Sequence, residues 1–132
     1  MNNILNEVHL ENGLTVRLID QTHHYFGGYY RVVLEIRCEI RVIRDFFSDQ
    51  GKFAAALSLL GHTVAYSRRV EQLGVPATER VAAIERLSSH FHTNSLSYFG
   101  TPQFPEKMVR SELVKVKRQR MFLNPYAASN DE

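Results

Sequence analysis

The stretch YYRVVLEIRCEIRVI, residues 29–43, decides the fold. Apolar side chains occupy every second position from Tyr30 to Val42, and Arg and Glu dominate the positions between them. Successive side chains of a β-strand point to opposite faces of the sheet, so this alternation predicts a strand with one apolar and one charged face. Its β-branched residues suit a pleated, half-buried surface.

The length of this strand adds a constraint. Fifteen extended residues span roughly 50 Å at about 3.3 Å each, which is long for a chain of this size. We therefore expect the strand to bend or twist, with Val32 and Val33 as a candidate bulge. An alternative is an arm that pairs with a second copy of the chain.

Composition predicts an ordinary globular protein. The chain has 132 residues, a formal net charge of +2 and a single cysteine. We expect one domain over residues 1–123 and a disordered tail over 124–132. Cys38 lies on the apolar face of the strand, which favours a buried side chain over a reactive thiol. The polar first residues and the lack of a long apolar run favour a cytoplasmic protein without a membrane segment.

A hairpin is predicted over residues 8–16. The Asn-Gly pair is typical of a two-residue turn, but that register puts Leu14 and Val16 on a charged face. A three-residue loop over 11–13 instead pairs Leu10 with Leu14 and places Gly13 at positive φ. In this interpretation Asn12→Asp is expected to have little effect.

In the rest of the sequence, amphipathic segments alternate with short segments that interrupt the secondary structure. Residues 14–20 form a second strand, and 21–28 connect it to the central strand. Ser48 or Asp49 caps a short helix over 52–60 that ends at Gly61. Residues 62–75 fit a strand or a helix, and a fourth strand is favoured.

Two longer helices follow. Pro76 opens the first, whose inward stripe is Val81, Ile84, Leu87, Ser88 and Phe91. The second begins at Pro105 and carries Val109, Leu113 and Val116 inward. The predicted fold is therefore α+β: an antiparallel three- or four-stranded meander with one short and two longer helices, the C-terminal pair covering its apolar face.

The sequence offers little catalytic chemistry. The pairs His23-His24 and His90-His92 do not have metal-ligand spacing, and adjacent residues on an extended chain point apart. Gly-x-Ser-x-Gly and glycine-rich phosphate motifs are absent from the sequence. We assign no catalytic, cofactor-binding or metal-binding residue, and an enzyme with a histidine-based site is the least favoured hypothesis.

One short stretch resembles part of a known family. Arg37-x₃-Arg41 followed by Ser48-x₂-Gly51 resembles pieces of the cyclic-dinucleotide-binding PilZ domain. That domain needs Asp or Asn where this chain has Phe46, and its two motifs lie farther apart. We therefore assign no family from these residues.

The densest aromatic cluster comprises Tyr25, Phe26, Tyr29 and Tyr30, with His23, His24 and Arg31 nearby. Such a cluster is typical of a nucleobase-stacking platform or a hot spot for a protein partner. The alternative interpretation is that the rings close the open end of the sheet.

The last helix is basic and includes the candidate residues Lys107, Arg110, Lys117 and Arg118. It indicates either a nucleic-acid surface or a solvated helix whose cations suit the helix dipole. The favoured function is a small cytoplasmic, non-catalytic interaction or regulatory module that binds a protein partner or a second copy of itself. A nucleic-acid-binding protein that uses this helix and the aromatic residues 25–30 is the alternative.

Overall fold

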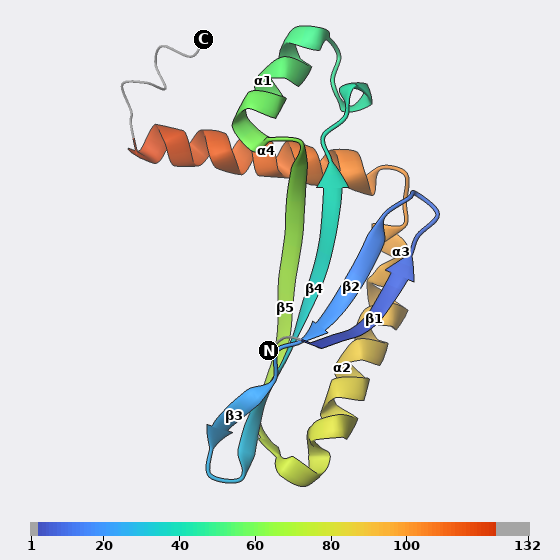
Figure 1. Cartoon of the computed structure of the whole chain (residues 1–132), viewed down its shortest axis with the longest axis vertical. Helices are drawn as coiled ribbons and strands as arrows, with labels where there is room; N and C mark the ends of the chain where they lie inside the picture. Colours follow the sequence, from blue (N-terminus) through green and yellow to red (C-terminus); the bar gives the residue numbers. More distant parts are fainter. Residues whose placement is uncertain (1–2, 124–132) are drawn as a thin grey trace. The chain divides into compact units, whose positions relative to one another are not determined.

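The computed structural model of the protein describes residues 3–123 and confirms the α+β class. Its sheet has five strands (Figure 1), one more than the larger number predicted. The strands are β1 (Asn3–His9), β2 (Thr15–Asp20), β3 (His23–Phe26), β4 (Tyr29–Arg41) and β5 (Thr63–Pro76). The additional strand is β3, which forms within the segment that the sequence analysis treated as a connection. The predicted tail over 124–132 lies outside the described residues.

Strand β4 is the centre of the sheet. It pairs antiparallel with β2 over residues 34–38 and with β3 over residues 29–31. Strand β5 also pairs with β4. Arg31 of β4 contacts Glu71 of β5, and Glu35 contacts Ser67, so that moving forward along β4 means moving backward along β5. Strand β5 is therefore antiparallel to β4, and the favoured strand over residues 62–75 is confirmed, with bounds Thr63–Pro76.

The chain forms two compact units. Unit 1 comprises residues up to Glu39 together with Ala65–Pro102, and unit 2 comprises Ile40–Val64 and the chain from Gln103 onward. Unit 1 contains most of the sheet, the 3₁₀ turn η2 (Ala77–Glu79) and the helices α2 (Arg80–Asn94) and α3 (Leu96–Phe99). Unit 2 contains the 3₁₀ turn η1 (Arg44–Phe46) and the helices α1 (Gln50–Leu60) and α4 (Phe104–Leu123).

The two faces of β4 differ as the alternation predicts. Every second residue from Val32 to Ile40 is at most 1% exposed, whereas Arg37, Glu39 and Arg41 are exposed. The opposite face is not exposed to solvent along its whole length, however, because Val33 and Glu35 are also buried. The segment between β2 and β3 and strand β5 each supply one partner of this carboxylate. Gln21 Nε2 donates to Glu35 Oε1 at 2.9 Å and Ser67 Oγ donates to Glu35 Oε2 at 2.5 Å.

The N-terminal hairpin has the predicted three-residue loop. Val8 pairs with Val16 and His9 with Thr15, and Gly13 has φ +88°. Leu10 N donates to Leu14 O at 2.8 Å, which closes the loop. The apolar pattern therefore selected the correct register over the commoner Asn-Gly turn.

Helix α2 packs its predicted stripe against the sheet, with one correction. Ile84 and Leu87 pack on a cluster that contains Val32 of β4 and Ala83, but Val81 is 66% exposed. The chain enters α2 from η2, so the helix begins at Arg80 and not at Pro76, and its buried side is centred on Ala83.

An aromatic cluster closes the far end of α2. Phe99 of α3 makes edge-to-face contacts with Phe91 of α2 and Tyr66 of β5, with ring centroids 5.4 Å and 5.1 Å apart. Phe99 is buried whereas its neighbour Tyr98 is 46% exposed. This geometry contributes about 0.5–1.5 kcal/mol per pair beyond area burial.

Unit 2 is built around α1 and α4. Asp49 caps α1 by accepting a hydrogen bond from Lys52 N at 2.7 Å, and Gly61 ends it with φ +79°. Helix α4 buries Phe104 and Val109, and Leu113 and Val116 are half-buried. The predicted cap, helix end and inward stripe are therefore confirmed.

Candidate functional site

The hairpin between β3 and β4 presents three large aromatic side chains to solvent. Tyr25 is 57% exposed, Phe26 75% and Tyr29 48%. We call these three residues the aromatic tip. Figure 1 shows the hairpin at the end of unit 1 where α2 begins. These three exposed rings do not close the end of the sheet, whereas Tyr30 is half-buried beside His24 and Arg80, in keeping with its predicted core parity.

The hairpin is held in place by the start of the helical segment. Ala77 N donates to Gly28 O at 3.1 Å. Tyr30, the next residue after the tip, lies between two side chains. His24 contacts its ring edge-to-face at 5.6 Å, and the Arg80 guanidinium lies 4.7 Å from its centroid. These contacts fix the base of the hairpin.

The turn itself is also fixed. Gly27 takes φ +55°, a conformation that residues with a Cβ rarely adopt. A nitrogen of the His24 ring is hydrogen-bonded to the carbonyl oxygen of Gly27. The aromatic tip is therefore carried by a defined turn.

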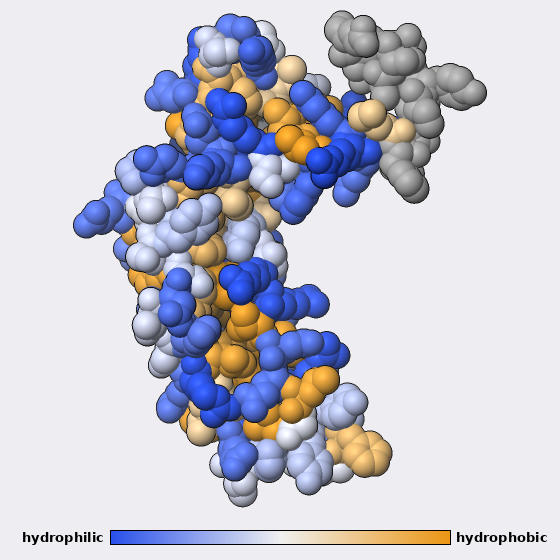
Figure 2. Space-filling model, turned by 180° about the vertical axis from the view of Figure 1, so that it is seen from behind, coloured by the Kyte–Doolittle hydropathy of each residue, from blue (hydrophilic) through white to orange (hydrophobic). Residues whose placement is uncertain are grey.

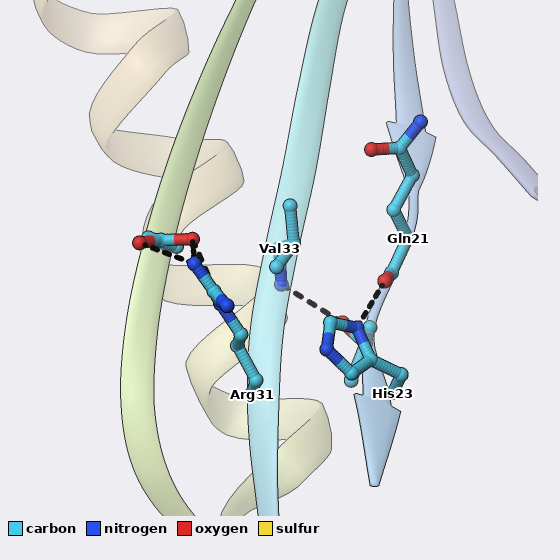
Figure 3. Close-up of polar contacts among 6 residues, drawn as sticks. Gln21, His23, Arg31 and Val33 are labelled. Carbon is cyan, nitrogen blue, oxygen red and sulfur yellow. Dashed lines mark hydrogen bonds and ion pairs between the residues drawn. The ribbon is translucent and has the colours of Figure 1, made fainter. Parts of the chain in front are cut away.

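Arg31 is occupied by a partner within the chain. Its Nη2 donates to Glu71 Oε2 at 2.8 Å and its Nε donates to the same oxygen at 3.0 Å. Figure 3 shows this pair bridging β4 and β5, with His23 on the other side of β4. Arg31 is therefore a fixed polar neighbour of the tip and not a free cation.

The basic candidates of α4 lie in unit 2 and divide into two kinds. Arg110 Nη2 donates to Phe46 O at 3.0 Å and therefore anchors the η1 turn. Lys107, Lys117 and Arg118 are exposed, and within residues 3–123 their side chains make no hydrogen bond or ion pair. The eight candidate residues thus belong to two different units, four in each.

A pocket of about 470 Å³ lies in unit 1 and was missed by the sequence analysis. It is lined by His9, Leu10, Glu11, His92, Leu96, Ser97 and Gly100. His9 Nδ1 is 2.9 Å from Thr15 Oγ1, and His92 Nε2 is 3.1 Å from Asn6 Nδ2. Only the fold brings these two histidines together, since they are far apart in the sequence and share no local motif.

In the described part of the chain no three His, Cys, Asp or Glu side chains gather as metal ligands. Burial raises the pKa of the Cys38 thiol from 9.0 to about 11, and the carboxylate of Glu39 adds to this shift. A thiol with a raised pKa and 1% exposure is a core side chain, as predicted.

Comparisons with other proteins do not assign the chain to a family. It matches no protein-family profile, no characterised protein and no solved structure. Among residues 3–123, no helix combines the length and the apolar character that crossing a membrane requires.

Proposed function

We propose that the protein is a non-catalytic interaction module that binds a protein partner through its aromatic tip. One observation carries this proposal: Tyr25, Phe26 and Tyr29 are all at least 48% exposed on a single turn. Aromatic rings each bury about 150–250 Å² when covered, and they dominate the energetics of protein interfaces.

The fixed hairpin supports this role. A partner that binds a defined turn loses less free energy in ordering it than one that must first order a flexible loop. His23 lies two residues before Tyr25 and Arg31 lies two residues after Tyr29, so polar side chains flank the aromatic tip along the chain. An apolar centre with a polar rim is the usual anatomy of a protein interface.

Chemical crosslinking in cells tests the proposal with a matched pair of variants. The tip variant carries Tyr25→Ser, Phe26→Ser and Tyr29→Ser. The control carries Val81→Ser, Val114→Ser and Met121→Ser, which removes three side chains of comparable exposure elsewhere. A protein crosslinked to the wild type and the control but lost from the tip variant supports the proposal, provided circular dichroism shows both variants folded. Equal recovery with all three contradicts it.

Helix α4 supports a second candidate function, the binding of nucleic acid. The supporting observation is that Lys107, Lys117 and Arg118 are exposed cations without partners in residues 3–123. Such side chains are available to phosphate groups, whereas Arg110 is not. Fluorescence anisotropy with a labelled polynucleotide at low salt tests this candidate.

A further inference from the structure

Strand β5 has one unpaired edge. Within residues 3–123 it pairs with β4 alone, although it is 14 residues long. Its middle section is accessible on both faces: Ser67, Arg68, Arg69, Glu71 and Gln72 are exposed, and Val70 is half-buried. Figure 2 shows the surface from behind the view of Figure 1, where hydrophobic side chains are interspersed with hydrophilic ones. An unpaired strand of this length is a template for pairing with another strand.

The order of charges along this edge is self-complementary. Two identical strands that pair antiparallel are related by a two-fold axis that passes between the two copies of one residue. Residues at equal distances before and after that residue then face each other across the axis. An axis at Val70 places Arg69 opposite Glu71 of the second copy, and Arg68 opposite Gln72. Each of these contacts occurs twice. Directly opposed side chains of opposite charge stabilise a strand pair.

We propose that two copies of this chain associate through the free edge of β5, with the two-fold axis at Val70. The five-stranded sheets of the two copies then form one continuous ten-stranded sheet. We assign a second copy of the chain as the partner of this edge, because the charges of the strand are complementary to those of an identical strand that runs in the opposite direction.

Neighbouring registers lack this complementarity. An axis at Arg69 places Arg68 opposite Val70, and an axis at Glu71 places Arg69 opposite Leu73. Charges that protect an edge from self-association do so by opposing like charges, whereas the axis at Val70 opposes unlike ones.

The existing contacts of Glu71 fit the proposal. Its carboxylate already accepts hydrogen bonds from Arg31 of the same chain. In the pair of copies, Arg69 approaches this carboxylate from the other side. Within residues 3–123 the side chain of Arg69 makes no hydrogen bond or ion pair, so it is available for this contact. A carboxylate has lone pairs enough for both guanidinium groups.

Exchanging charges tests the pairing. Arg69→Glu opposes two like-charged pairs and should weaken the dimer roughly ten- to hundredfold. The double variant Arg31→Glu/Glu71→Arg keeps the contact within the chain but sets Arg69 of one copy against the arginine introduced at position 71 of the other, so it too should be monomeric. An equimolar mixture of these two proteins should form a heterodimer, because each contact between the copies then joins opposite charges.

Analytical ultracentrifugation from micromolar to millimolar concentration measures all four samples. The proposal expects a wild-type dimer, two monomeric variants and a dimer in the mixture. A monomeric wild type over the whole range overturns it. So does a dimer that both variants retain, because its interface then lies elsewhere.

Disulfide trapping tests the position of the axis without altering charge. In wild-type background, Val70→Cys places the two new thiols opposite each other and should yield a crosslinked dimer on mild oxidation. Leu73→Cys is the control on the same strand. Its two copies lie roughly 20 Å apart at about 3.3 Å per residue, too far for a disulfide. Crosslinking at Leu73→Cys but not at Val70→Cys, or equally at both, overturns the axis.

Discussion

The side-chain amide of Asn12 donates a hydrogen bond of 2.7 Å to the main-chain oxygen of Phe99, 87 residues further along the chain. The same nitrogen donates at 2.9 Å to Thr101 O. The side-chain oxygen of Asn12 accepts from Leu14 N within the loop. One amide therefore ties the β1–β2 loop to the end of α3.

Asn12→Asp should destabilise the protein by about 1–3 kcal/mol. The substitution removes both donors and sets a carboxylate against two carbonyl oxygens. The sequence alone suggested that this change matters little, and the structure reverses that expectation. Urea titration measures the difference. Asn12→Ala is the control, since it loses the donors without adding a charge, and it should be less harmful than Asn12→Asp.

Gly13→Ala should cost about 1 kcal/mol and Gly13→Val more. The backbone at Gly13 has φ +88°, and no atom lies within 4 Å of an added Cβ, so the whole cost is backbone strain. Gly28→Ala is the matched control, because Gly28 also has open space around it but lies outside the positive-φ region. Thermal unfolding should show the lower melting temperature for Gly13→Ala. Equal melting temperatures would refute the strain argument.

Ile36→Ala should cost about 2–5 kcal/mol, because a fully buried side chain is replaced by a cavity. Its neighbour Arg37 is exposed, and its contact with Glu35 is 4.0 Å long. Arg37→Ala should therefore cost well under 1 kcal/mol. Denaturant titration of the two variants compares the faces of β4 directly. The opposite order would mean that the faces have been assigned wrongly.

The stability of the wild type should fall between about pH 9 and about pH 11 through Cys38. Burial raises the pKa of this thiol from 9.0 to about 11. In this window the unfolded chain has released the proton and the folded chain retains it, so the free energy of unfolding decreases as the pH rises. Cys38→Ala lacks this contribution. Urea titrations at several pH values measure the free energy of unfolding of both proteins. The free energy of unfolding of the wild type, relative to that of Cys38→Ala, should decrease from about pH 9 to about pH 11. A difference that stays constant over this range would contradict the prediction.

If α4 binds nucleic acid, three engaged cations should give a slope of about −2.7 for log K against log salt on duplex DNA. Lys117→Ala and Arg118→Ala should each reduce the slope by about one unit and leave stability nearly unchanged. Arg110→Ala is the contrast, since it removes the hydrogen bond to Phe46 O and should lower stability without changing the slope. Absence of binding at low salt removes this candidate function.

Local pattern was sufficient to predict much of the fold. The apolar face of β4, the loop around Gly13 and a cap at Ser48 or Asp49 depend on residues close together in the sequence, and the structure confirms all three. Val81 was wrong because the buried side of α2 is centred on Ala83, and a separation of two residues places Val81 about 200° away around the helix.

The candidate site was predictable only as a set of residue types. The cluster of aromatic residues at 25–29 was visible in the sequence, but their exposure follows from the pairing of β3 with β4. The partners of Arg31, Arg110 and Glu35 come from other parts of the chain. The pocket containing His9 and His92 joins the first hairpin to the end of α2, and no local pattern encodes such a meeting.

The bond from Asn12 to Thr101 spans 89 residues, which sets a delay during synthesis. At about 5–20 residues per second, a ribosome needs roughly 4–18 s to add that length of chain. Until then the β1–β2 loop lacks the hydrogen bonds that join Asn12 to the end of α3. Val16 and Leu18, which are at most 1% exposed in the finished protein, belong to the strand of this hairpin that pairs with β4. The first hairpin is therefore made first and waits for that length of chain before its loop is joined to the rest of unit 1.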